Sequence, residues 1–391
     1  MPGLVLIGLL AVSLALRLWL AWRQARYLRH VEDARLRRYA TARAVFGIGV
    51  AACQAGLILA LTLGGIIAWL ERVWRPGPMA GAGIVGTVVL AFSLLAGVAH
   101  IGQSLTIDAR SGLERRRLGA CLCSALVAVA ASVALAALAG QALSWLIATY
   151  PTVWWLWATV LAGFGLSAKA NLGSRGPSHT SAQAGPADAP DLSAALARCE
   201  LPNIPVRVRK SPTGARRANA RIVGAGRALH VEVSDTLLAL LTRTEVEAVL
   251  AHEAGHCRRH HFARDLAAQI GLVAGGFAVL ALAMRSPAIA QGLGISGARS
   301  AGWLALAVTL APLAWFFLRP MRAYQRRRFE YEADDFAARH ADAGALMRAV
   351  AKLNAANATP PASDPLYVRV YNFHPDERDR FRRLRASIGA D

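Results

Sequence analysis

The sequence predicts a mainly α-helical, polytopic membrane protein with seven spanning helices and a small α+β lobe. Three observations lead to this fold class. Apolar residues make up 55% of the 391 residues and gather in long blocks. Charged residues make up only 17%, against about 25% in soluble domains. Strand-like alternation of apolar and polar residues follows residue 199, which indicates a small sheet outside the apolar blocks.

The charge balance is strongly basic, with 44 Lys and Arg against 24 Asp and Glu. In a soluble chain this excess would indicate nucleic-acid binding. In a membrane protein, basic loops orient the spans and contact anionic lipid. We therefore predict a lipid bilayer as a partner and no nucleic acid. The composition also excludes a wholly soluble enzyme and a disordered scaffold.

Seven apolar blocks are long enough, or nearly so, to cross a bilayer core of about 30 Å. The first lacks a basic leader and is predicted to be a retained span rather than a cleaved signal. The ends of the fourth are uncertain, and the sixth is short enough to be a buried soluble helix instead. The blocks are residues 3–22, 46–70, 79–101, 118–148, 152–172, 266–284 and 300–318.

Basic loops at 23–43 and 102–117 fall on the same side of the predicted spans. The positive-inside rule places them in the cytoplasm and the N-terminus outside. The expected organisation is a five-span region over 1–172, a linker over 173–198, a cytoplasmic lobe over 199–265, two further spans over 266–318, and a cytoplasmic C-terminal part over 319–391.

The lobe begins with short strands at Val206–Val208 and His230–Val233. Gly224–Gly226 is predicted to be a hairpin turn before the second of these strands. A short helix is expected from Asp235 to Leu241. The lobe is therefore a small sheet followed by helices.

A second helix is predicted from Thr244, with Glu247 completing a capping box, to about His261. It contains His252-Glu253-Ala254-Gly255-His256, the pattern HExxH. Residues four apart share one helix face, so both imidazoles can reach one ion while Glu253 reaches a water on it. The competing interpretation is two helix histidines that face solvent or lipid headgroups. The motif, the capped helix and the expected sidedness favour one zinc ion per chain.

Zinc needs a third protein ligand. The extended pattern with a further histidine six residues on is not met, because Phe262 stands there. His260 and His261 are less favoured, since the next helical turn faces away from the metal. Glu330 and Asp334 are better candidates, because they are four apart on one helix face just after the last span. The competing interpretation is an ordinary solvated acidic face.

Four motifs occur in the order found in the type I CAAX prenyl proteases, which are integral-membrane zinc metalloproteases. They are Asn219-Ala220, the HExxH helix, Phe329-Glu330-Tyr331 with Ala333-Asp334, and His374-Pro375 with Arg380. The chain therefore resembles this family and the HtpX-like proteases, which are HExxH gluzincins. The resemblance covers about 200–391 closely and the N-terminal spans only by architecture. One departure is Arg221, which follows Asn-Ala where the family usually has an aromatic residue.

The resemblance implies a zincin-like catalytic lobe and a role for each matching residue. It assigns His252, His256 and Glu330 to zinc and Glu253 to the general base. It implies that Asp334 orients a ligand histidine. It also implies that His374 and Arg380 stabilise the oxyanion or hold the peptide, and that Asn219 and Ala220 pair with an extended substrate.

The expected function is a membrane-embedded zinc metalloendopeptidase that hydrolyses peptide bonds at the cytoplasmic face, with a peptide or membrane protein as substrate. Alternatives are a membrane sensor with a signalling metalloprotease domain, processing of CAAX-type prenylated substrates, or a catalytically dead scaffold. The scaffold is disfavoured because HExxH and the later acids are present. The arginine and alanine bias suggests a high-GC bacterium, so the expected location is the bacterial inner membrane, multi-pass.

Overall fold

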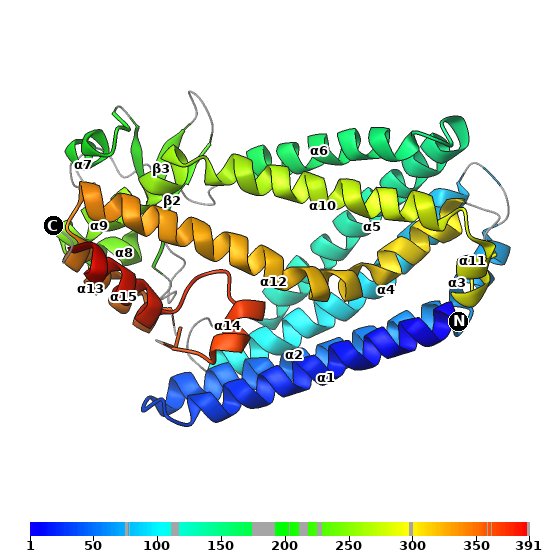
Figure 1. Ribbon diagram of the computed structural model, residues 1–391, viewed down its shortest axis with the longest axis horizontal. Coiled ribbons are helices and arrows are strands. Elements are labelled where there is room, and N and C mark those ends of the chain that lie inside the picture. Colours follow the sequence, from blue (N-terminus) through cyan, green and yellow to red (C-terminus); the bar gives the residue numbers. More distant parts are fainter. Residues whose placement is uncertain are drawn as a thin grey trace.

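The computed structural model describes residues 1–74, 77, 79–110, 117–173, 192–202, 204–210, 218–224, 229–296, 300–357, 359–360 and 362–388. Long helices form an elongated bundle, and a small lobe with a sheet lies at the end away from the N-terminus (Figure 1). This confirms the predicted mainly α-helical fold with a small α+β lobe.

Six helices in the described part are long and apolar enough to cross a membrane. They are α1 (Pro2–Leu28), α2 (Ala34–Leu61), α4 (Ala80–Gly102) continued by the π-helical η1 (Gln103–Asp108), α5 (Leu118–Thr149), α10 (His261–Ala283) and α12 (Ser300–His340). The predicted fifth span corresponds to α6 (Trp154–Gly173), which lies beside α10 (Figure 1). It is not one of the six, and it carries three tryptophans, which favour membrane interfaces over the hydrocarbon core.

The predicted block 46–70 is not one helix. α2 ends at Leu61, the chain turns, and α3 (Ile66–Val73) begins after Gly65. Gly65 has a φ of 74°, which glycine adopts without the steric cost that a side chain would add. The predicted basic loop 23–43 is also mostly helical, because α1 and α2 extend into it.

The sheet of the lobe has the strand order β1-β3-β2. The central strand β3 (His230–Ser234) pairs in parallel with β1 (Val206–Arg209) and antiparallel with β2 (Ala220–Val223). Both predicted strands are confirmed. The predicted turn at Gly224–Gly226 extends beyond the described residues. β2 therefore forms one edge of the described sheet.

Two helices follow the sheet, α8 (Asp235–Leu240) and α9 (Arg243–Arg258). The cap of α9 is Thr242 with Glu245, so the predicted capping box was wrong by two residues. Glu245 accepts a hydrogen bond of 2.8 Å from the Thr242 N–H, and Thr242 Oγ1 accepts from the Glu245 N–H. Glu247 instead pairs with Arg198 at 2.7 Å.

The remaining helices are α7 (Ser193–Arg198), α11 (Pro287–Gly292), α13 (Ala343–Ala356), α14 (Pro365–Tyr371) and α15 (Glu377–Ile388). The spans of the bundle pack around a core that includes Trp154 and Trp303. A second core joins the sheet to α9 through Val231, Val233 and Leu250. A third lies between α9, α12 and α13. α9 therefore packs against the sheet through one core and against α12 and α13 through the other.

Gly255 allows α9 and α12 to approach closely. A Cβ atom at this position would lie 3.0 Å from Ala333 Cα and 3.1 Å from the Ala333 carbonyl oxygen. We expect Gly255→Ala to destabilise the protein by about 1–3 kcal/mol, because the neighbouring backbone must shift. Gly271→Ala in α10 is the matched control, since nothing lies within 4 Å of its Cβ. Thermal unfolding in detergent should separate the two variants, and equal midpoints would contradict this packing argument.

Candidate metal centre

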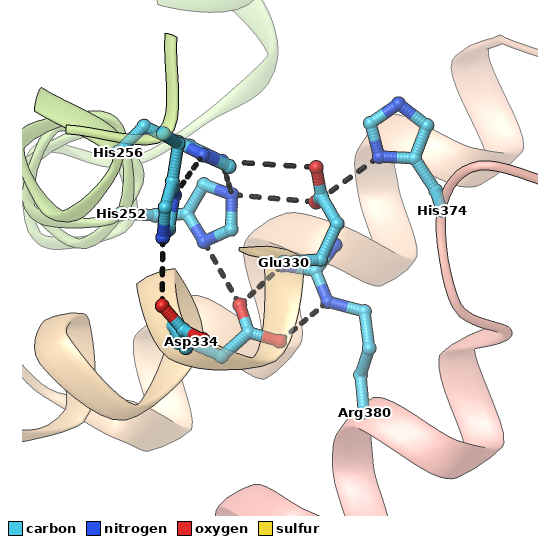
Figure 2. A network of polar contacts seen from close by, with 8 residues as sticks. His252, His256, Glu330, Asp334, His374 and Arg380 are labelled. Carbon is cyan, nitrogen blue, oxygen red and sulfur yellow. Dashed lines mark hydrogen bonds and ion pairs between the residues drawn. The ribbon is translucent and has the colours of Figure 1, made fainter. Parts of the chain in front are cut away.

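Two histidines of α9 and one glutamate of α12 point at a common position (Figure 2). His252 Nε2 lies 3.2 Å from His256 Nε2. Glu330 carboxylate oxygens lie 3.6 Å from His252 Nε2 and 3.7 Å from His256 Nε2. The two residues of HExxH converge because they are one helical turn apart, and Glu330 reaches them because α12 crosses α9 at this point.

This donor set suits a zinc ion. Tetrahedral ligands about 2.1 Å from one ion are about 3.4 Å from each other. The three observed separations, 3.2, 3.6 and 3.7 Å, bracket that value. Two imidazoles and one carboxylate also match a catalytic zinc site, which keeps its fourth position for water.

The two α9 histidines have opposite pKa shifts. Burial dominates for His256, and carboxylate contacts dominate for His252. Burial lowers the pKa of His256 to about 3, and a neutral imidazole is the form that binds a metal. Burial alone would also lower the pKa of His252, but the contacts with Asp334 and Glu330 outweigh it and raise that pKa to about 10. Of these two carboxylates, Glu330 faces His252 Nε2, the nitrogen that a metal ion would bind, whereas Asp334 faces His252 Nδ1.

The second ring nitrogen of His252, Nδ1, contacts an acid, which in turn accepts hydrogen bonds from an arginine. His252 Nδ1 lies 2.9 Å from Asp334 Oδ1. Arg380 of α15 donates two hydrogen bonds to Asp334, of 2.8 and 2.5 Å (Figure 2). Asp334 is buried, and the Arg380 side chain is only 11% exposed. Asp334 lies against His252, and Arg380 lies against Asp334. The orienting role of Asp334 and the role of Arg380 at an oxyanion both stay predictions.

His256 has its own support, which the sequence analysis missed. Its Nδ1 lies 2.9 Å from Nδ1 of His261, and His261 Nε2 lies 3.1 Å from Glu332. His261 also stacks on Phe329 with ring centroids 4.5 Å apart. The turn between α9 and α10 makes this contact, because His260 adopts a left-handed conformation with φ of 54°. His261 therefore contacts one of the converging histidines and is not itself part of the converging set of His252, His256 and Glu330.

Replacing His261 should weaken zinc binding about 10–100-fold, since it leaves His256 without the contact that fixes its ring. We expect this loss for His261→Ala in a titration against a competing chelator. His260→Asn is the control, because the neighbouring His260 is exposed and asparagine tolerates its backbone conformation. Equal zinc affinity in the two variants would show that the His256–His261 contact does not support the ligand.

His374 approaches Glu330 from the other side. Its Nδ1 lies 3.0 Å from Glu330 Oε2 (Figure 2), and its side chain is 76% exposed. The buried Arg327 fixes the segment before it by donating to the carbonyl oxygens of Val368 and Asn372, at 2.9 and 2.8 Å. His374 therefore stands beside the metal residues with much of its ring open to a ligand.

A cavity of about 1030 Å³ opens beside the metal residues. Glu253 lines it, and burial raises the pKa of this carboxyl to about 7, because the charged form loses hydration. Asn219 and Ala220, from the β2 edge of the sheet, line the same cavity. The structure thus brings together all nine residues that the sequence singled out: Asn219, Ala220, His252, Glu253, His256, Glu330, Asp334, His374 and Arg380.

Residues 193–388, half of the chain, match the profile of peptidase family M48. The chain belongs to this family. The match begins at α7 and ends at α15, so it contains every residue of the candidate metal centre. M48 membership confirms the resemblance on which the sequence analysis relied.

Two known proteins extend the comparison. The protease HtpX homolog of Pyrobaculum calidifontis is 34% identical over 126 residues, which are 32% of this chain and 35% of that protein. The chain thus matches about a third of the length of that curated relative. The crystal structure of S. mikatae Ste24p has 15% identity, a TM-score of 0.81 and 98% coverage of both chains. This similarity shows that the whole chain, bundle included, shares the Ste24p fold.

Proposed function

We propose that this M48 protein is a membrane-embedded zinc metalloendopeptidase, with one zinc ion per chain, that hydrolyses peptide bonds in peptides or membrane proteins. The convergence of His252, His256 and Glu330 at tetrahedral spacing supports the proposal most directly. These three residues would hold the ion, which supplies a Lewis acid and lowers the pKa of an attacking water.

Glu253 is the general base in this proposal. It takes a proton from the attacking water and passes it to the leaving nitrogen. Its pKa near 7 suits both transfers at neutral pH. Asp334 and His261 hold the rings of His252 and His256 in place. His374 stands on the side of Glu330 away from these supports, where it can donate to the oxyanion.

The edge strand β2 supports a binding mode for the substrate. An extended peptide would pair with the β2 edge beginning at Asn219 and Ala220, by strand addition. Glu253 lies beside the backbone N–H of Ile222 in this strand. A peptide paired with β2 would therefore pass directly over the general base.

We also propose that the site lies at the cytoplasmic face of a bacterial inner membrane. The basic segment 23–43, where α1 connects to α2, supports this placement. It lies at the end of the bundle that carries the lobe (Figure 1), and basic segments beside spans stay in the cytoplasm. Fusions after residue 388 test this placement. We expect a fluorescent C-terminal green fluorescent protein and an inactive C-terminal alkaline phosphatase, and the reverse pattern would place the site outside.

The enzymatic proposal is tested with the full chain in detergent. We expect it to cleave unfolded casein, to lose this activity with 1,10-phenanthroline, and to regain it when zinc is restored after the chelator is removed. Cleavage that persists in the fully zinc-depleted protein would contradict a zinc peptidase. The Arg26→Gln variant is a suitable control, because Arg26 is exposed and is not among the residues that line the cavity.

A further inference from the structure

Arginines of the membrane helices line the same cavity as the metal residues. They are Arg17 of α1, Arg43 of α2 and Arg319 of α12. Arg17 lies about 22 Å along α1 from Pro2, and Arg319 about 28 Å along α12 from Ser300, at 1.5 Å per residue. Arg17 falls within the predicted span 3–22, and Arg319 directly follows the predicted span 300–318. Charged residues in or next to a membrane span are costly and face a cavity or a partner.

Aromatic groups hold these arginines in place. The guanidinium of Arg17 lies 4.2 Å from the centre of the Phe316 ring and interacts with the Tyr371 hydroxyl. Arg319 donates to the Tyr371 carbonyl oxygen at 3.2 Å and lies 5.0 Å from the Tyr371 ring. The Nε of Arg319 is buried and has no hydrogen-bond partner among the described residues. Arg17 and Arg319 therefore both contact Tyr371, and the Nε of Arg319 remains available as a hydrogen-bond donor.

Neither Arg17 nor Arg319 forms an ion pair with an acid among the described residues. Arg43 reaches an acid only indirectly, because it contacts the Tyr39 hydroxyl, which donates to Asp108 at 3.0 Å. Other arginines of the bundle are neutralised: Arg322 and Arg326 pair with Asp265, and Arg23 pairs with Asp364. The cavity residues contributed by α1, α2, α4 and η1 include no carboxylate. The wall formed by these four elements therefore carries Arg17 and Arg43 without a carboxylate. The carboxylates of the cavity, Glu253, Glu330, Asp376 and Glu377, come from α9, α12 and the C-terminal segment.

We propose that Arg17 and Arg319, with Tyr371, form a subsite that binds a carboxylate of the peptide substrate. The inference rests on the proposed peptidase function. Tyr371 precedes His374 by three residues, so the subsite and the metal centre share one short segment. A peptide that pairs with β2 and passes over Glu253 would continue into the cavity that these arginines line. Guanidinium groups bind carboxylates with paired, charge-assisted hydrogen bonds.

The proposed subsite predicts a measurable preference for substrates that carry a carboxylate. A carboxylate held by arginines away from bulk water should be favoured over the matching amide by about 10–100-fold, because the amide leaves the cations unpaired. The carboxylate comes from an acidic side chain or from the free C-terminus of the substrate. Either source predicts that the cleaved bond lies at a fixed number of residues from the acid.

The experiment uses the zinc-loaded full chain in detergent and a mixture of random synthetic peptides, with the cleavage sites read by mass spectrometry. We expect an acidic side chain or the C-terminus at a fixed spacing from the cleaved bond. One cleaved peptide is then made in acid and amide forms. The ratio of their kcat/KM values should be about 10–100 for the unmodified enzyme. It should fall to about one for Arg17→Gln/Arg319→Gln.

Control variants separate recognition from folding. Arg26→Gln, on the same helix as Arg17, should keep the full ratio. Arg17→Lys/Arg319→Lys should restore part of it, because the charge returns without the planar fork. Zinc content and thermal unfolding check that each variant is folded. If the double variant is unfolded, Arg17→Gln alone takes its place.

Three results would overturn the subsite. Equal kcat/KM for acid and amide peptides in the unmodified enzyme would remove it and leave the peptidase intact. An unchanged ratio in folded Arg17→Gln/Arg319→Gln would assign the selectivity to other residues. If Arg17→Gln/Arg319→Gln loses activity only in nanodiscs with phosphatidylglycerol, while the acid-to-amide ratio of kcat/KM is unchanged, the bound anion is a lipid phosphate.

Absence of cleavage of every peptide would refute the peptidase itself. In that case, equal binding of labelled acid and amide peptides to zinc-loaded Glu253→Gln would exclude the subsite too.

Discussion

Glu253→Gln should retain zinc and lose hydrolysis, with kcat lower by about 10²–10⁴-fold. The amide has nearly the same shape as the carboxylate but does not accept the proton of the attacking water. Glu253 is not one of the three residues whose donor atoms converge, so the metal should remain in place. Zinc content by atomic emission and cleavage of casein by the same preparation measure both effects together.

The matched control is Glu247→Gln, in the same helix α9 but in an ion pair with Arg198 on the surface. It should keep both zinc and activity. A zinc-loaded Glu253→Gln enzyme with near-normal turnover would remove Glu253 from the mechanism. Loss of zinc from Glu253→Gln would instead show that this residue supports the metal site.

Glu330→Ala should lose zinc more completely than Asp334→Ala, and Glu332→Ala should lose the least. Glu330 places its carboxylate within 3.7 Å of both histidines. Asp334 contacts Nδ1 of His252, which is not the nitrogen of the converging set, so its removal should weaken zinc about 10–100-fold. Glu332 contacts His261, which in turn contacts His256. Its effect on zinc should therefore be less direct. Titration against a competing chelator ranks the three variants.

The order of affinities is the decisive result of that titration. If Asp334→Ala or Glu332→Ala binds zinc more weakly than Glu330→Ala, the assignment of the third ligand is wrong. Asp335→Ala is the control, since the half-exposed Asp335 only approaches Arg383, at 3.7 Å. It should bind zinc like the unmodified chain.

Sequence reasoning succeeded where helical periodicity governs the structure. His252 and His256 share a face of α9, and Glu330 and Asp334 share a face of α12, because each pair is four residues apart. The capping residue of α9 was harder to predict, since both Thr242 and Thr244 have a glutamate three residues later. The structure selects Thr242 and Glu245, and the buried Glu245 also accepts from Lys352 at 2.7 Å. A contact 107 residues away in sequence decided between two equivalent local patterns.

The outer support of the metal centre could not be predicted from periodicity. On a continuous helix, His261 would point about 140° away from His256. The turn at His260 removes that constraint and folds His261 back onto His256. Arg380 and Asp334 are 46 residues apart in sequence, so no local pattern connects them. The break between α2 and α3 was missed because hydropathy measures polarity and does not detect a backbone turn.

α12 is one helix that extends from the membrane bundle to Glu330 of the candidate metal centre. The helix runs from Ser300 to His340, with Pro312 and Pro320 inside it. Prolines remove helical hydrogen bonds and are the usual places where a helix bends. Glu330 lies about 15 Å beyond Pro320, so a bend of about 4° there would move Glu330 by about 1 Å. A mismatch between the hydrophobic length of a helix and the lipid thickness is accommodated in part by tilting or kinking of the helix. Such a change in α12 would move Glu330 relative to the histidines of α9, so we expect zinc affinity and catalytic rate to vary with acyl-chain length.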